Sequence, residues 1–261
     1  MKRLFAAVHA VMARRILVNF RVQPEVIVPL LPAPFRPKCV NDWAMAGICL
    51  IRLADMRPSW LPRLLGMSSE NAAHRIAVEW TADSTTREGV FIPRRDTDSF
   101  INRIAGGRLF PGVHHPAQFR CEQIGSRFDV ELHSKDGEAN VRVAARLADG
   151  WGAGSVFASL GDASAFFRSG CCGWSPVNGN GGVEGVELCT ETWAMHPLVV
   201  ERVESSFFAD RRRFPPGSVE FDCALLMQGV AHKWRALDSF PSDSTNPPTG
   251  SHRLTSFFDM P

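Results

Sequence analysis

The stretch Gly89–Phe119, GVFIPRRDTDSFINRIAGGRLFPGVHHPAQF, gathers charged residues, glycines and paired histidines into one short segment. It begins with Val90–Pro93, whose apolar and β-branched residues predict a short strand. That strand delivers Arg94, Arg95 and Asp96. We interpret the whole stretch as the wall of a pocket for a small molecule.

Beyond this strand the stretch turns back on itself. We expect a brief helical piece around Ser99–Ile104 and then a turn at Gly106-Gly107-Arg108. The turn leads to His114 and His115, whose side chains point to opposite faces if the backbone is extended. The same alternation separates Arg94 from Arg95, so one of the two faces the pocket, and the sequence does not decide which.

The segment just upstream, His74–Trp80, carries charge within a strand pattern. Apolar residues and His74 share one face, while Arg75 and Glu79 share the other with a small residue. An ordinary antiparallel sheet turns such a face to water, but a closed sheet can use it to line a polar interior. Glu70 and Asn71 precede this strand, and again only one of the two faces the pocket.

Other segments predict further strands and one helix. Ser159 is a plausible N-cap with Asp162 three residues on, so we expect a helix that ends at Gly170. Alternation and turn signals predict strands over these ranges: 15–22, 43–54, a three-stranded meander over 118–147, then 185–193, 199–208 and 218–226. The fold class is therefore mostly β, with an antiparallel sheet and a few short helices.

Composition excludes several classes of protein. Apolar residues make up 45% of the chain and the net charge is +2, which is typical of a globular protein and gives no nucleic-acid signal. No segment approaches the ~20 apolar residues of a membrane-spanning helix. The seven cysteines are scattered with no C-x-x-C spacing, which predicts reduced thiols and a cytoplasmic location. The alternative of an N-terminal secretory signal is disfavoured because His9 interrupts its apolar run.

Organisation along the chain is simple. We expect a single domain over residues 1–240 and a flexible tail over residues 241–261, where Ser, Pro and Thr are frequent. The oligomeric state is left open and includes a homo-oligomer.

Gly107–Pro116, GRLFPGVHHP, resembles the signature of the acetoacetate decarboxylases, in which a Gly-Arg-Glu motif leads into Pro-Lys-Lys. The chain is more similar to an uncharacterised branch of that superfamily, the YqjF-like proteins. The matching segments are Ser69–Asn71, His74-Arg75, Ile92–Asp96, Phe110–His115, Gly154–Ser159, Ser205–Phe208 and Gly217–Asp222. The resemblance implies a sheet closed into a cone or barrel.

The resemblance also bears on chemistry. His115 occupies the position of the Schiff-base lysine, and Pro116 that of the second lysine. The resemblance therefore implies that iminium chemistry is absent. The expected function is binding of a small oxo- or carboxylate-bearing metabolite. The alternatives are an enzyme that uses His115 as general acid or base, and a scaffold with a vestigial pocket.

The candidate site is therefore assembled from several segments. His115 is the candidate catalytic residue, and no cofactor or metal is expected. The candidate ligand-binding residues are Glu70, Asn71, Arg75, Arg94, Arg95, Asp96, Arg108 and His114.

Overall fold

A computed structural model describes residues 8–58, 62, 66–100, 111–177 and 182–240. The strands are β1 (Val8–Val22), β2 (Arg36–Pro37), β3 (Cys39–Val40), β4 (Trp43–Pro58), β5 (Met67–Ala82), β6 (Thr85–Thr97), β7 (His114–Ile124), β8 (Arg127–Ser134), β9 (Asn140–Leu147), β10 (Cys172–Pro176), β11 (Val183–Thr190), β12 (His196–Ser205) and β13 (Val219–Phe240). The helices are α1 (Pro24–Ile27), η1 (Val28–Leu30), α3 (Leu160–Ser169) and α4 (Ser206–Ala209).

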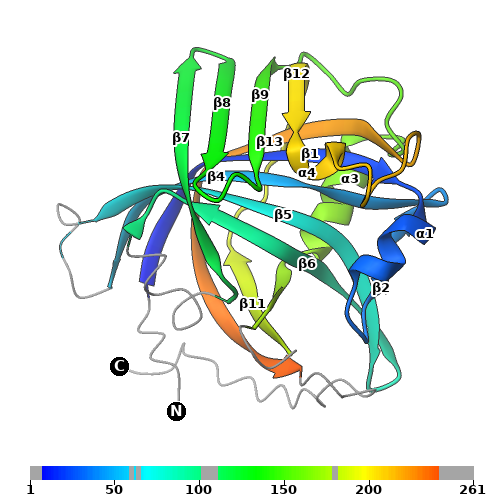
Figure 1. The fold of residues 1–261 in the computed structure, drawn as a ribbon. Helices are drawn as coiled ribbons and strands as arrows, with labels where there is room; N and C mark the ends of the chain where they lie inside the picture. Colours follow the sequence, from blue (N-terminus) through cyan, green and yellow to red (C-terminus); the bar gives the residue numbers. More distant parts are fainter. Residues whose placement is uncertain (1–7, 59–61, 63–65, 101–110, 178–181, 241–261) are drawn as a thin grey trace.

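All the described strands belong to one sheet, which closes on itself twice (Figure 1). One ring runs β13–β1–β4–β5–β6–β10–β11 and returns to β13; we call it the seven-strand ring. The second leaves β6 through β7, β8, β9 and β12 to reach β13; we call it the nine-strand ring. Five strands are therefore a wall common to both rings. The mostly antiparallel, ring-forming sheet with short helices confirms the predicted fold class.

The common wall is buried on both faces. In β1, β4 and β5 the buried residues form unbroken runs over 16–20, 44–50 and 72–78. Two separate apolar clusters explain this, because one packs against each face of the wall. Alternation of apolar and polar residues is lost where a sheet has core on both sides, even when its strands are antiparallel.

Helix α3 covers the cluster on the seven-strand side. The Ser159 hydroxyl accepts a hydrogen bond from the Asp162 amide at 3.1 Å, and the helix ends before Gly170, as the sequence predicts. Phe167 and Ala163 on this helix are buried in the cluster. Among the described residues, no helix combines the length and apolar character needed to cross a membrane.

Several elements differ from their expected bounds. Strand β6 continues through Pro93 as far as Thr97, and β13 continues beyond Leu226 to Phe240. Strand β10 was not predicted at all. The expected helical piece around Ser99–Ile104 and the turn at Gly106–Arg108 lie wholly or mostly outside the described residues, and the tail beyond residue 240 lies outside them entirely.

Candidate functional site

A β-bulge in β6 decides which arginine faces which ring. Ile76 of β5 pairs with Phe91, while His74 pairs with Arg94, so three steps along β6 match two along β5. The extra residue shifts the alternation of side chains along β6. As a result Arg95 points into the seven-strand ring and Arg94 points to the opposite face.

Arg95 is a cation with incomplete pairing. Its Nε donates to the Ser175 hydroxyl on β10 at 3.1 Å. Its Nη2 is out of contact with solvent, and among the described residues it has neither a hydrogen-bond partner nor a carboxylate within ion-pair distance. Burial lowers the pKa of Arg95 to about 10, which still leaves the guanidinium charged at neutral pH. A buried, charged group without a counter-ion is costly.

The cavity beside Arg95 has a volume of about 60 Å³. We call it the Arg95 cavity, and it is lined by Ile51, Leu53, Asn71, Ala72, Ala73, Arg95, Asp96, Pro111, His114, Val186 and Trp234. A cavity of this size with polar groups in its lining holds a few water molecules or a small anion.

His114 lies in the Arg95 cavity as a neutral imidazole. Burial lowers its pKa to about 3, and the charge on Arg95 acts in the same direction. An uncharged imidazole does not compete with Arg95 for an anion, and one of its ring nitrogens already hydrogen-bonds the Gly112 backbone. A pKa near 3 also makes His114 a weak base at neutral pH.

Asn71, rather than Glu70, faces the Arg95 cavity. Its Nδ2 donates to the Ser69 hydroxyl at 2.9 Å, and its Oδ1 accepts from the Thr97 hydroxyl at 2.8 Å. Glu70 points to the opposite face of the sheet. There its carboxylate accepts from Arg14 at 2.7 Å and from Arg52 at 3.1 Å, which makes it part of an ion-pair network.

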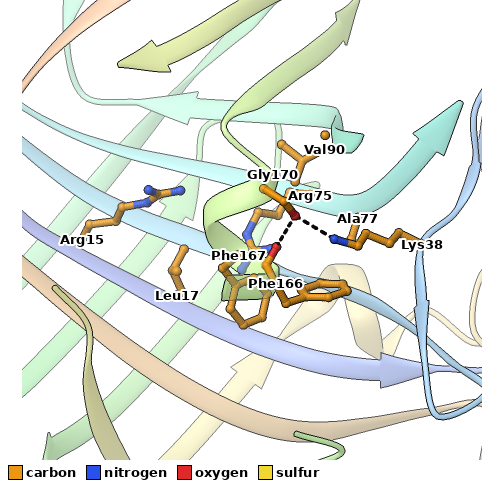
Figure 2. A pocket seen from close by; sticks show the side chains of 11 residues that line it. Arg15, Leu17, Lys38, Arg75, Ala77, Val90, Phe166, Phe167 and Gly170 are labelled. Atoms are coloured by element: carbon orange, nitrogen blue, oxygen red, sulfur yellow. Dashed lines mark hydrogen bonds between the residues drawn. The ribbon is translucent and has the colours of Figure 1, made fainter. Parts of the chain in front are cut away.

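Arg75 lies inside the same ring but lines a different space. It is 4% exposed, donates to the Asn19 side-chain oxygen and stacks over the Phe167 ring at 4.9 Å. Burial lowers the pKa of Arg75. The space beside it, shared with Arg15 and Lys38, amounts to only about 10 Å³ (Figure 2). It is large enough for a water molecule at most.

His115 lies on the opposite face of the sheet, in a pocket of about 220 Å³. Its Nδ1 is 3.0 Å from Asp136 Oδ2, and Arg94 donates to both Asp136 and Asp96. Burial would raise the pKa of Asp136, but hydrogen bonds from Arg94, Ser134 and a backbone amide outweigh it and lower the pKa. We call this the His115 pocket; its residues are Leu30, Ile76, Pro93, Arg94, His115, Glu138, Phe207 and Arg213.

The expected pocket wall is thus divided between two faces of the sheet. The Arg95 cavity brings together Asn71, Arg95 and His114. Asp96 also lines it, but the Asp96 carboxylate is bound by Arg94 on the opposite face. Arg94 and His115 line the other pocket, and Glu70 belongs to neither. Arg108 lies outside the described residues. Sequence reasoning missed Ser175, which hydrogen-bonds Arg95 from β10, and Trp234, which lines the cavity from β13. Pro93 could have indicated that Arg95 rather than Arg94 faces the cavity, because proline within a strand often marks a bulge.

Comparisons with known proteins define the class. Over 91% of this chain and 94% of the other, the fold matches an acetoacetate decarboxylase-like enzyme from Sphingomonas wittichii RW1, with a TM-score of 0.58 and 15% identity. The enduracididine biosynthesis enzyme MppR, in complex with pyruvate, matches with a TM-score of 0.58 and 12% identity over 90% of each chain. Acetoacetate decarboxylase from Legionella pneumophila matches with a TM-score of 0.50 and 11% identity over 90% of each chain.

The protein therefore has an acetoacetate decarboxylase-like fold. Residues 9–219 match the family DUF2071, described as an uncharacterized conserved protein, and the chain belongs to that family. This confirms the resemblance to the YqjF-like branch. No curated protein matches the sequence significantly.

Proposed function

We propose that this protein binds a small carboxylate- or oxo-acid anion in the Arg95 cavity. One observation carries the proposal: Arg95 places a charged guanidinium beside a cavity, with Nη2 unpaired and no described carboxylate within reach. An anionic ligand would supply the missing counter-ion, and a carboxylate matches the fork of guanidinium donors.

The rest of the cavity fits the same ligand class. Neutral His114 and the Asn71 amide line the cavity without adding negative charge, and its apolar side chains suit a short carbon chain. The pyruvate complex of MppR shows that one protein with this fold binds a small keto acid.

Binding is tested by calorimetric titration of the full chain with pyruvate and acetoacetate. Arg95→Lys should weaken binding about tenfold, because it replaces a bidentate fork by a point charge. Arg120→Lys, at an exposed position on β7, is the matched control and should leave the affinity unchanged. Equal affinities for wild type and Arg95→Lys would place the ligand elsewhere.

We further propose that binding proceeds without a Schiff base. Lys38 donates to Glu88 at 2.6 Å and to Ser169 at 2.7 Å, and it lines the 10 Å³ space rather than the Arg95 cavity. Lys233 is exposed on β13. Borohydride treatment with pyruvate should therefore leave the mass of the protein unchanged. A stable adduct mapped to Lys38 would contradict this.

One observation favours a second candidate, an enzyme that transfers protons in the His115 pocket. Asp136 holds His115 through Nδ1, which leaves Nε2 available to exchange a proton with a ligand. If so, His115→Ala should leave affinity nearly unchanged and lower turnover by about 10² to 10⁴. A protein that binds no small acid at either site would support the scaffold reading.

We propose a cytoplasmic location on the pattern of the cysteines, which are scattered along the chain with no C-x-x-C spacing.

A further inference from the structure

Two cysteines and a glutamate meet on the β10–β11 hairpin. Cys171 immediately precedes β10 and Cys172 opens it, and Cys172 pairs directly with Glu187 of β11. Residues directly opposite each other in an antiparallel ladder have their side chains on the same face. The hairpin therefore presents two sulfur atoms and a carboxylate at one place.

These groups are close enough to share an ion. One sulfur atom from each cysteine and one carboxylate oxygen of Glu187 all lie within 4.8 Å of one another. Ligand bonds to Zn²⁺ are about 2.0–2.3 Å long, so the ligands of one tetrahedral ion lie roughly 3.5 Å apart. Small side-chain rotations would bring the three atoms to that spacing.

Arg235 on β13 orients the glutamate and leaves one of its oxygens free. Both Nε and Nη2 of Arg235 donate to Oε2 of Glu187. Within the part of the chain that the structure describes, Oε1 has no hydrogen-bond partner. Carboxylate ligands of metal ions are commonly held in this way by a second group, which fixes the direction of the free oxygen.

We propose that Cys171, Cys172 and Glu187 bind one thiophilic divalent cation, for which Zn²⁺ is the best match. Sulfur is the ligand that such ions prefer, and three protein ligands leave a fourth position for water or a further ligand. None of the family-matching segments described in the sequence analysis includes these three residues.

The charge balance agrees with a dication. Two thiolates and one carboxylate carry three negative charges, and Arg235 and a divalent ion carry three positive ones. Both thiols would lose their protons when the ion binds, because only thiolates bind it tightly.

This cluster is separate from the Arg95 cavity. Gly173 and Ser175, which alternate with Cys172 along β10, face Arg95, so the cluster lies on the reverse side of the hairpin. The metal-binding proposal is therefore independent of anion binding at Arg95.

The test uses the reduced full chain and Zn²⁺ alone, in competition with a chromogenic chelator. Wild type should bind one equivalent of Zn²⁺. Cys171→Ser should weaken binding by about 100-fold or more, because even the loss of an outer-sphere partner commonly costs about 10–100-fold. Cys39→Ser removes an exposed thiol elsewhere and should change nothing.

Two further measurements guard against misfolding and chance binding. Glu187→Gln keeps the side-chain shape and should weaken Zn²⁺ binding at least tenfold while thermal unfolding without metal stays cooperative. Cobalt titration should give the intense near-ultraviolet absorption of thiolate–cobalt bonds, and that absorption should disappear in Cys171→Ser. Equal Zn²⁺ affinity in wild type and Cys171→Ser, or a cobalt spectrum without thiolate absorption, would overturn the proposal.

Discussion

Arg94 and Arg95 are consecutive residues with opposite electrostatic surroundings. Arg94 donates to two carboxylates, those of Asp96 and Asp136, whereas no described carboxylate pairs with Arg95. A single extra residue in β6 separates the two environments. The structural cation and the proposed ligand-binding cation are thus neighbours in the chain.

Opposite stability effects are expected at these two positions. Arg95→Met should raise the free energy of unfolding of the ligand-free protein by about 1–3 kcal/mol, because it removes a partly buried charge that lacks a counter-ion. Arg94→Met should lower it by about 3 kcal/mol, because it leaves the buried Asp96 without its cation. Urea unfolding measures both. A loss of stability in Arg95→Met would show that this arginine is structurally paired.

Acid should destabilise the protein partly through His74. Both ring nitrogens of His74 lack hydrogen-bond partners among the described residues, and burial lowers its pKa from 6.5 to about 3. Between those values the unfolded chain binds a proton that the folded chain does not, so stability falls as the pH falls below 6.5.

Thermal unfolding from pH 7 to pH 4 tests this dependence. His74→Phe should flatten the fall in stability, while His196→Gln, at an exposed position, should leave its slope unchanged. His114 and His232, whose pKa values burial also lowers, should maintain the remaining dependence. An unchanged slope in His74→Phe would contradict the assignment.

Replacing Glu70 should lower the free energy of unfolding much more than replacing its ion-pair partner Arg52. Arg14 is buried, and Glu70→Gln would leave it without a carboxylate, at a cost of about 3–5 kcal/mol. The side chain of Arg52 is 51% exposed, so Arg52→Ala should cost less than about 1 kcal/mol. Chemical denaturation distinguishes these outcomes, and similar losses in both variants would argue that the network acts as one unit.

Gly47 should not tolerate a side chain. A Cβ atom at this position would lie 2.3 Å from the Val18 carbonyl oxygen, which belongs to the neighbouring strand β1. Gly47→Ala should therefore destabilise the protein by about 1–3 kcal/mol. Gly152→Ala, where a Cβ meets nothing within 4 Å, should change stability by less than about 0.5 kcal/mol. Melting temperatures of the two variants provide the comparison.

Sequence patterns correctly predicted the features that depend on residues close together in the chain. The two faces of His74–Trp80 followed from alternation, because Ile76 and Val78 pack in one apolar cluster and Ala77 in the other. Capping by Ser159 placed the start of α3 correctly, since the hydroxyl and the amide that it satisfies are three residues apart. The choice between a water-facing and an interior charged face required the closed rings.

Long-range pairing explains what the sequence did not reveal. The alternation of Arg94 and Arg95 was predictable, but their directions depend on the bulge and on the parallel neighbours of β6. Ser175 reaches Arg95 only because β10 lies beside β6, and such parallel pairs leave no local pattern. The histidine expected at the ligand, His115, therefore lies on the opposite face from Arg95, and His114 lines the cavity instead.

In the middle of β1, β4 and β5 the common wall is buried on both faces, and this constrains how the protein can respond to a ligand. A side chain that shifts there on one face has packed neighbours behind it, because protein interiors are nearly incompressible. On β5, Asn71 faces the Arg95 cavity while Glu70 and His74, beside it in the chain, are buried on the reverse face. Any movement of β5 that admits a ligand to the Arg95 cavity must also displace those residues. A structural change on one face of β5 is therefore coupled to a change on its other face.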